Sequence, residues 1–377
     1  MVNESWEDTP VRRAKVRGCL LGGAIGDALG NPVEFLSLGA IRRTYGEQGV
    51  TGPVPDAEGM TGRVTDDTQM TLFTVEGLIR AQARAAGKGI GGGETAAVRN
   101  AYARWLDTQN HPSPPRRGGD DPIRTGWLRE QPWLYARRAP GNACLTGVAA
   151  GHVPDPLGAF GAPGPVNPGS KGCGTVMRSA PFGLMGVPAR RAFELAARCA
   201  QITHGHPTGY YAAGALAAIV THLLEGDTPE GAVLRSLEIL RRYPGHDETT
   251  AALRAAVDLA ADGRSPSAEK VESLGAGWVA EEALAIAVHC TLARTESVAE
   301  ALLLSVNHSG DSDSTGSICG NLLGAHHGDV HLPAAWLAAT EGKGVIAELA
   351  DDLCLQFVSA SMDHGEPVHP RERYPHN

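Results

Sequence analysis

Two short acidic clusters, far apart in the 377-residue chain, carry the residue types best suited to chemistry. Residues 65–68 read TDDT and residues 311–315 read DSDST, and each cluster directly precedes a run with helical periodicity. Oxygen ligands of this kind suit Mg²⁺, Mn²⁺ or Ca²⁺ and do not suit zinc. If the clusters met, their four aspartates would repel one another unless cations neutralised them. Two divalent ions about 3.5–4 Å apart would do so and would form a hydrolytic site.

Each cluster alone also has a purely structural explanation. Asp, Ser and Thr are favoured at helix N-caps, and Asp66 and Gln69 have the spacing of a capping box. A cap needs one carboxylate, whereas each cluster offers two. Spacing alone does not show that the clusters meet, so capping and metal binding both remain open at this point.

Three further segments carry candidate site residues. Pro32 should end a helix, which would place Glu34 just beyond its C-terminus. In residues 170–178 (SKGCGTVMR), the glycines would let backbone N–H groups approach a phosphate, although a simple tight turn also fits. Residues 203–207 (THGHP) hold two histidines, and there we favour a turn with one packed imidazole and assign no metal.

The elements that must position these residues are helices. Apolar alternation typical of strands is nearly absent, which makes a sheet-based core improbable. Ala- and Leu-rich stretches with apolar residues at three- and four-residue spacing predict helices over 94–109, 206–225, 229–242, 248–262, 279–293 and 343–358. The predicted fold class is therefore all-α.

Glycine recurs every four residues from Gly18 to Gly30, and again from Gly316 to Gly324. Each interior glycine costs a helix about 1 kcal/mol relative to alanine, so the pattern needs a compensating reason. Four-residue spacing places the glycines on one stripe, where another backbone can come very close. We expect close helix packing that brings together the polar residues at the helix ends.

Composition excludes several classes of function. The net charge of -9, from 33 Lys and Arg against 42 Asp and Glu, argues against an extended nucleic-acid-binding face. The apolar stretch 18–29 is too short for a membrane span and contains Asp27, and the polar N-terminus does not resemble a secretion signal. Seven scattered cysteines without a C-x-x-C pair indicate reduced thiols, so we expect a cytoplasmic protein.

We expect a single domain over residues 1–377, with a core of about 12–358 and short tails near 1–10 and 362–377. The region of about 110–172 is rich in proline and glycine and predicts irregular structure. Such a region is either a binding loop or lid, or a surface excursion packed by its own aromatic residues. Both interpretations remain open.

Taken in order, these segments resemble the ADP-ribosylglycohydrolase family, which includes the ADP-ribosyl-acceptor hydrolases and the dinitrogenase reductase-activating glycohydrolases. The resemblance runs from about residue 15 to about residue 358. It rests on GCLLGGAIGDALGNPVEF (18–35), GRVTDDTQMTLFTVEGL (62–78), SKGCGTVMRSAPFGL (170–184), ITHGHPTGYYAAGAL (202–216) and NHSGDSDSTGSICGNLLGAHHG (307–328).

The resemblance implies a compact all-α domain with two Mg²⁺ ions, or Mn²⁺ in some members, in a cleft that takes ADP-ribose. The residues that match metal ligands are Thr65, Asp66, Asp67, Asp311, Asp313 and Ser314. Those that match the loop around the diphosphate and distal ribose are Gly172, Cys173, Gly174, Thr175, Met177 and Arg178, with Cys173 in place of the usual Asn. His204 matches a residue beside the nucleotide, and Glu34 an acidic residue implicated in catalysis.

The implied activity is Mg²⁺-dependent hydrolysis of the glycosidic bond between ADP-ribose and an acceptor, through an oxocarbenium-like state. Glu34 or Asp67 would take a proton from the attacking water. Two alternatives remain: a dinuclear phosphohydrolase of ADP-ribose or dinucleotides, and an ADP-ribose-binding protein without activity. The acceptor, whether modified arginine, serine, nucleic acid or a small conjugate, is not specified by the sequence.

Overall fold

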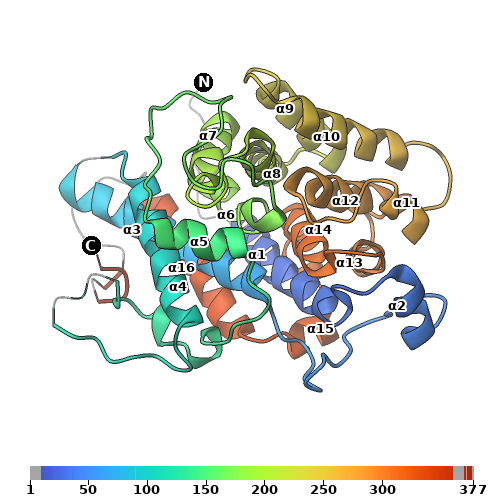
Figure 1. Ribbon diagram of the computed structural model, residues 1–377, viewed down its shortest axis with the longest axis horizontal. Helices are drawn as coiled ribbons and strands as arrows, with labels where there is room; N and C mark the ends of the chain where they lie inside the picture. The colour runs from blue at the N-terminus through green and yellow to red at the C-terminus, as the bar shows by residue number, and fades with distance from the viewer. Residues whose placement is uncertain are drawn as a thin grey trace.

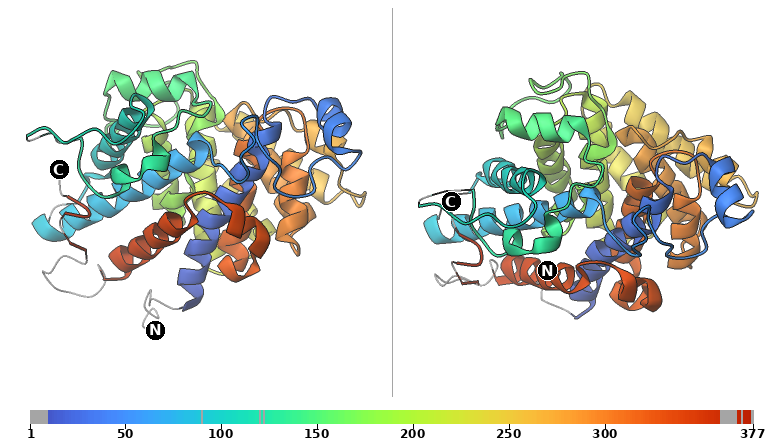
Figure 2. Two further views of the ribbon diagram at one scale, coloured as in Figure 1. Left: turned by 90° about the horizontal axis from the view of Figure 1, so that it is seen from below. Right: turned by 60° about the horizontal axis from the view of Figure 1, so that its bottom comes forward.

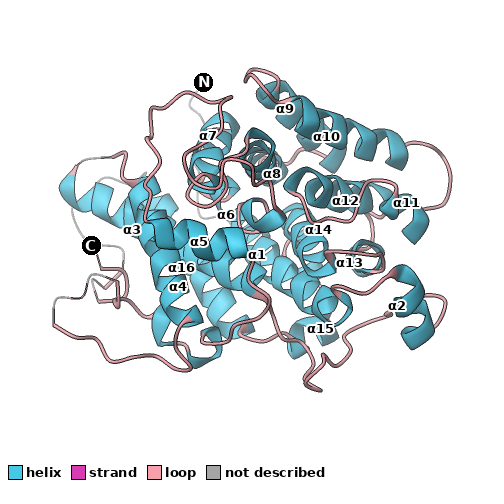
Figure 3. Cartoon of the chain, viewed as in Figure 1, coloured by secondary structure: helices cyan, strands magenta, loops and turns pink. Residues whose placement is uncertain are grey.

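The computed structural model describes residues 10–89, 91–119, 121, 123–359, 369–370 and 372–375. Helices dominate the fold (Figures 1 and 3). The α-helices are α1 (Pro10–Gly30), α2 (Leu38–Tyr45), α3 (Asp66–Lys88), α4 (Glu94–Gln109), α5 (Asn142–Ala150), α6 (Ala180–Gly183), α7 (Ala189–Ala200), α8 (Pro207–Leu224), α9 (Pro229–Leu240), α10 (Asp247–Ala260), α11 (Ala268–Glu272), α12 (Ala280–Ala293), α13 (Val298–Val306), α14 (Ser312–His327), α15 (Ala334–Ala339) and α16 (Lys343–Ser359). Short 3₁₀ turns lie at η1 (Asn31–Val33), η2 (Leu128–Glu130), η3 (Pro132–Leu134), η4 (Cys173–Thr175) and η5 (Asp329–His331).

The all-α prediction is confirmed. The six helices expected from periodicity correspond to α4, α8, α9, α10, α12 and α16, with ends within two residues of the predicted ones. Among the described residues, β-type pairing is limited to two isolated bridges, Pro55 with Thr61 and Gly172 with Val279. None of the described helices is long and apolar enough to cross a membrane.

The two glycine stripes pack against each other. A Cβ built on Gly22 would stand 2.4 Å from the carbonyl oxygen of Gly320, and one on Gly18 would stand 2.4 Å from that of Gly324. The backbones of α1 and α14 are therefore in contact along the stripe, and the two helices run antiparallel; Figure 2 shows α1 in blue beside α14 in orange. The C-terminus of α1 consequently meets the N-terminus of α14.

A buried carboxylate fixes the start of α3 against the same end of α1. Asp27 is fully buried and accepts the backbone N–H of Thr65 at 2.9 and 3.0 Å from its two oxygens. It also accepts the N–H of Thr68 at 3.1 Å and the hydroxyl of Thr68 at 2.5 Å. Three helix ends thus converge on one place, and each carries acidic residues.

The buried apolar side chains form one cluster that runs from Val16 to Tyr374. Residues 1–9, 362–368, 371 and 376–377 of the predicted tails lie outside the described residues. Tyr374 does not behave as part of a tail, because its side chain is buried and its hydroxyl donates to Asp352 at 2.6 Å. All seven cysteines are free thiols, as the scattered spacing predicted.

The region of about 110–172 is irregular, as predicted, apart from η2, η3 and α5. Its aromatic residues pack into the molecule: Tyr135 is buried, and Trp127 lies under the guanidinium of Arg373 at 3.9 Å. Residues 139–144, 170 and 172 of this region line the cavity described next.

Candidate functional site

A cavity of about 330 Å³ opens where the C-terminal end of α1 meets the N-termini of α3 and α14. The two acidic clusters, remote in the chain, therefore do meet. The residues proposed from sequence that line it are Glu34, Asp66, Asp67, Asp311, Asp313, Ser314, Gly172, Cys173, Gly174, Met177 and His204. Thr65, Thr175 and Arg178, proposed together with them, are buried and are not part of its lining.

Five carboxylates gather on one side of this cavity. One oxygen from each of Glu34, Asp311 and Asp313 lies within 4.8 Å of the other two. Asp66 and Asp67 line the same wall and are 5% and 2% exposed. So many buried carboxylates cannot all be ionised at this separation without a counter-charge, because desolvation and mutual repulsion both oppose it.

The pKa values in the cluster follow from this crowding. Burial, and then the charge of Asp313, raises the pKa of Asp66, Asp67 and Asp311 well above the usual aspartate value. Burial, followed by the charges of Asp313 and Asp311, likewise raises the pKa of Glu34 far above its usual value. Burial and crowding therefore oppose full ionisation of the cluster unless cations balance its charge.

The donor set fits hard divalent cations. Among the described residues no group donates a hydrogen bond to Oδ1 of Asp67, although this oxygen is buried. Such an unsatisfied buried acceptor is costly unless a bound group that is not part of the protein interacts with it. The lining oxygens come from carboxylates and the Ser314 hydroxyl, as Mg²⁺ and Mn²⁺ prefer.

Thr65 acts as the N-cap of α3. Its hydroxyl accepts the N–H of Asp67 at 3.3 Å, so the cap is Thr65 and not Asp66, which is the first helical residue. Thr65 and Asp27 satisfy the helix terminus, which leaves the carboxylates of Asp66 and Asp67 available to the cavity.

Arg178 reaches the cavity only through other side chains. It lies behind the wall, donating to Thr203 Oγ1 at 2.5 Å and to Cys144 Sγ at 3.2 Å. Arg178 is not among the residues that line the cavity. The Thr203 hydroxyl donates to the carbonyl of Ala200 at 3.3 Å and lies 2.7 Å from Nδ1 of His204.

His204 lies on the cavity wall with Nε2 beside Gly172, where a Cβ would stand 3.2 Å from it. Burial, and then the charge of Arg178, lowers the pKa of His204 to about 3, so the ring is neutral at neutral pH. One ring nitrogen of His204 therefore carries a proton and the other is an acceptor.

The loop at Gly172–Thr175 differs from the expected cradle of free N–H groups. The N–H of Cys173 donates to the carbonyl of Trp278 at 3.1 Å, and that of Thr175 donates to Gly172 at 3.4 Å. Two of its four backbone donors are thus occupied within the protein. Thr175 has a supporting role instead, because its hydroxyl donates to the carbonyl of Gly209 at 2.8 Å.

Cys173 lies against the acidic cluster. Burial, and then the neighbouring charge of Asp311 and a hydrogen bond with it, raises the pKa of the Cys173 thiol well above its usual value. The protonated thiol therefore places a donor next to Asp311.

Two aromatic residues at the cavity were not anticipated. Phe35 and Trp278 line it and stack on each other, with ring centroids 5.2 Å apart and an interplanar angle of 24°. They are 66% and 41% exposed, which is unusual for rings of this size. Phe35 follows Glu34 with a φ of 67°, so the backbone at this point is strained for a residue with a side chain.

The other unanticipated residues are Asp27 and the wall segment of residues 139–144, which also lines the cavity. A signal existed for Asp27, because a carboxylate inside an otherwise apolar helix must find buried partners. The wall segment gave no comparable signal, since nothing in its composition distinguishes it from the rest of the irregular region.

Comparison with known proteins agrees with this geometry. Residues 8–361 match the sequence family described as ADP-ribosylglycohydrolase. The chain is 29% identical over 343 residues to an uncharacterized protein of Archaeoglobus fulgidus, covering 90% of this chain and 95% of that protein. It is 27% identical over 329 residues to the ADP-ribosyl-dinitrogen reductase glycohydrolase of Rhodospirillum rubrum, covering 86% and 90%. A solved chain of an ADP-ribosylglycohydrolase-related protein complex shares the fold, with a TM-score of 0.60, 24% identity and coverage of 92% and 98%.

Proposed function

This chain belongs to the ADP-ribosylglycohydrolase family, and from that premise we propose that it removes ADP-ribose from an acceptor by Mg²⁺-dependent hydrolysis of the glycosidic bond. The family and the named relative support an enzyme that hydrolyses ADP-ribose linkages. The observation that carries the metal-dependent part is the approach of carboxylate oxygens from Glu34, Asp311 and Asp313 to within 4.8 Å, beside Asp66 and Asp67.

We propose Asp66, Asp67, Asp311, Asp313 and Ser314 as the metal ligands, together with Thr65 at the start of α3. Two Mg²⁺ ions, or Mn²⁺, held by these residues would lower the pKa of a water molecule and bind hydroxyl groups of the substrate ribose. The two ions would then balance all but one of the negative charges of the five carboxylates in the cluster. Asp66, Asp67 and Asp313 also lie in the first turns of α3 and α14, where the helix dipole favours anions.

Glu34 is the best candidate for moving a proton. Unlike the aspartates it follows the C-terminal end of α1, and its N–H donates to the carbonyl of Gly30 at 2.9 Å. The helix dipole at that end disfavours a permanent negative charge. Glu34 is also less buried than the four aspartates, so it can exchange protons with water at the cavity mouth. Glu34 is therefore the proposed general base, with Asp67 acting as a ligand.

The remaining walls supply contacts for the substrate. His204 places Nε2 of a neutral ring beside Gly172 and Gly174, which suits a hydrogen bond with a polar group of the substrate. Phe35 and Trp278 present exposed ring faces beside Glu34, which suits a planar group of the substrate. The acceptor itself is not assigned.

The test is a panel of ADP-ribosylated arginine, serine and nucleotide substrates, each assayed with Mg²⁺ and with a chelator. We expect at least one substrate to release intact ADP-ribose only with Mg²⁺, and Glu34→Gln to lose this turnover while it still binds ADP-ribose. Equal rates in the chelator would contradict the metal assignment. Release of AMP would instead indicate a phosphohydrolase, and calorimetric binding of ADP-ribose without any turnover would indicate a binding protein.

A further inference from the structure

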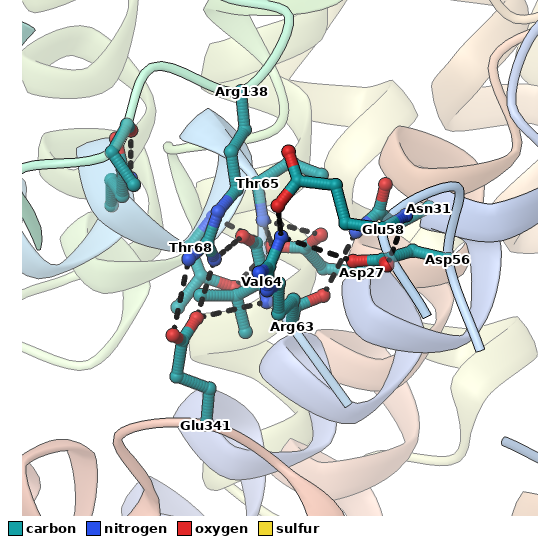
Figure 4. Close-up of polar contacts among 12 residues, drawn as sticks. Asp27, Asn31, Asp56, Glu58, Arg63, Val64, Thr65, Thr68, Arg138 and Glu341 are labelled. Atoms are coloured by element: carbon teal, nitrogen blue, oxygen red, sulfur yellow. Dashed lines mark hydrogen bonds and ion pairs between the residues drawn. The ribbon is translucent and has the colours of Figure 1, made fainter. Parts of the chain in front are cut away.

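An ion pair outside the cavity holds the peptide that leads into the first acidic cluster. Arg138, from the irregular region, pairs with Glu341, which precedes α16; their side chains are 17% and 23% exposed. Nη1 of Arg138 donates to the carbonyl of Val64 and to Oε2 of Glu341, and Nη2 donates to Oε1 at 3.1 Å. The N–H of Val64 donates back to Oε2 of Glu341 at 3.4 Å. Figure 4 shows the side chains of Arg138 and Glu341 meeting at Val64.

The two residues therefore form hydrogen bonds with both the N–H and the carbonyl of Val64, whose side chain is fully buried. Val64 directly precedes Thr65, whose own N–H is held by Asp27 from α1. The start of α3 is thus fixed on one side by α1 and on the other by Arg138 and Glu341. We call these last two residues the clamp.

The clamp also adjoins the wall segment 139–144 of the cavity. Arg138 directly precedes Ala139, the first residue of the wall segment 139–144. The N–H of Gly141 in this segment donates to the carboxylate of Asp66, and Gln69 of α3 donates from Nε2 to the carbonyl of Ala136 at 2.9 Å. Residues 136–141 are therefore bonded to the first turn of α3 on either side of the clamp.

We propose that the clamp of Arg138 and Glu341 couples the two halves of the site, so that binding of divalent cation by residues 65–67 and binding of ADP-ribose against residues 139–144 strengthen each other. The inference rests on the proposed function. Arg138 and Glu341 touch neither substrate nor the proposed ligand oxygens, and they act through Val64 and Gly141 as positioning residues. Outer partners of this kind affect metal affinity by about 10- to 100-fold.

Arg63, next to the clamp, provides a matched control for Arg138. Arg63, one residue before Val64, pairs with Glu58 at 2.5 Å and with Asp56 at 3.4 Å, and its side chain is 23% exposed. It is thus a half-buried arginine in an ion pair on the same segment, and its side chain is not among those that bond Val64. Arg63→Met removes the same charge as Arg138→Met and leaves the clamp in place.

The experiments measure, by calorimetry on the full chain and on each variant, the affinity for Mg²⁺ and the affinity for ADP-ribose with Mg²⁺ and with a chelator. We expect Arg138→Met to weaken Mg²⁺ binding by about 10-fold and to reduce the factor by which Mg²⁺ strengthens ADP-ribose binding. Arg63→Met should keep the wild-type values of both. Glu341→Gln, whose backbone N–H still donates to Gly62 at 2.8 Å, should show the same loss as Arg138→Met, and Arg138→Lys should recover part of it.

Thermal unfolding of each variant separates coupling from general damage. A merely structural role would lower the melting temperature and leave the ratio of the two ADP-ribose affinities unchanged, and that result overturns the clamp proposal. So does a wild-type ratio in both Arg138→Met and Glu341→Gln. If the wild-type protein itself binds ADP-ribose equally well with Mg²⁺ and with chelator, the metal-dependent part of the proposed function fails, and the clamp proposal fails with it.

Discussion

The backbones of Gly26 in α1 and Gly316 in α14 are so close that a Cβ on Gly26 would stand 2.0 Å from the carbonyl oxygen of Gly316. This contact determines the geometry of the site. Because the helices are antiparallel, the same close approach brings Glu34, beyond the end of α1, next to Asp311 and Asp313 at the start of α14. A side chain of any size between the helices would move these carboxylates apart.

Gly26→Ala should therefore damage both the fold and the site. Overpacking of a tight core commonly costs about 1–3 kcal/mol, and a clash with backbone cannot be relieved by a rotamer change, so we expect the upper end of that range. Urea denaturation measures the change. The control is Gly39→Ala in α2, where the nearest atom to an added Cβ is 3.5 Å away and we expect a gain of about 0.5–1 kcal/mol. Equal stabilities of the two variants would contradict the proposed packing.

The sequence was sufficient for the glycine stripes, for eleven of the twenty residues that line the cavity, and for helices α4, α8, α9, α10, α12 and α16. Periodicity reports burial of one face, and glycine spacing reports close approach, so both can be read locally. The convergence of residues 65–68 with 311–315 remained a hypothesis at the level of sequence, because it depends on how α1, α3 and α14 pack. Arg178 illustrates the opposite limit: its charge and its place in the loop suggested a ligand contact, whereas tertiary packing turned it toward Thr203 and Cys144.

The residues that hold the site in place were harder to find than those that line it. Asp27 and the Arg138–Glu341 pair act on backbone groups of Val64, Thr65 and Thr68. A contact between a side chain and a distant peptide leaves no spacing pattern in a sequence. Such residues become visible only when the three helix ends are placed together.

Asp67→Asn should separate stability from function. The substitution removes the cost of protonating, or of burying as an anion, a carboxyl whose pKa is raised by burial and by the charge of Asp313. We therefore expect the metal-free protein to melt at a higher temperature than wild type. Hydrolysis with Mg²⁺ should fall by at least about 100-fold, since metal stabilisation of charge contributes several kcal/mol. A variant that is less stable without metal and active with it would contradict the assignment of Asp67.

The metal-free protein should lose stability as the pH rises. Burial, and then the charge of Asp313, raises the pKa of Asp27 from 3.8 to about 7, and Glu34, Asp66, Asp67 and Asp311 shift in the same direction. A carboxyl with a raised pKa in the folded state contributes stability that is complete below its unfolded value and is lost as the pH passes the folded value. For Asp27 this window is pH 3.8 to about 7.

Mg²⁺ should oppose this loss, because it competes with protons for the same oxygens. We expect the melting temperature in chelator to fall from pH 5 to pH 8, and the increase on adding Mg²⁺ to be larger at pH 8. Differential scanning fluorimetry across this range, with Ca²⁺ and Mn²⁺ in parallel, measures both effects. A melting temperature in chelator that rises with pH would show that the cluster is not a set of buried, mutually repelling acids.

Asp27→Asn tests whether the buried carboxylate positions the first ligand group. The amide oxygen of an asparagine can still accept the N–H of Thr65, but its NH₂ group would face the N–H of Thr68, which then loses its acceptor. An unsatisfied buried donor costs about 1–3 kcal/mol, and we expect urea denaturation to show a loss in this range. Because the start of α3 also shifts, Mg²⁺ affinity should fall by about 10-fold. Thr68→Ser keeps the hydroxyl and the N–H that Asp27 accepts, so it should retain wild-type Mg²⁺ affinity. If Asp27→Asn lowers stability and leaves Mg²⁺ affinity unchanged, Asp27 supports the fold of α3 without positioning the ligands.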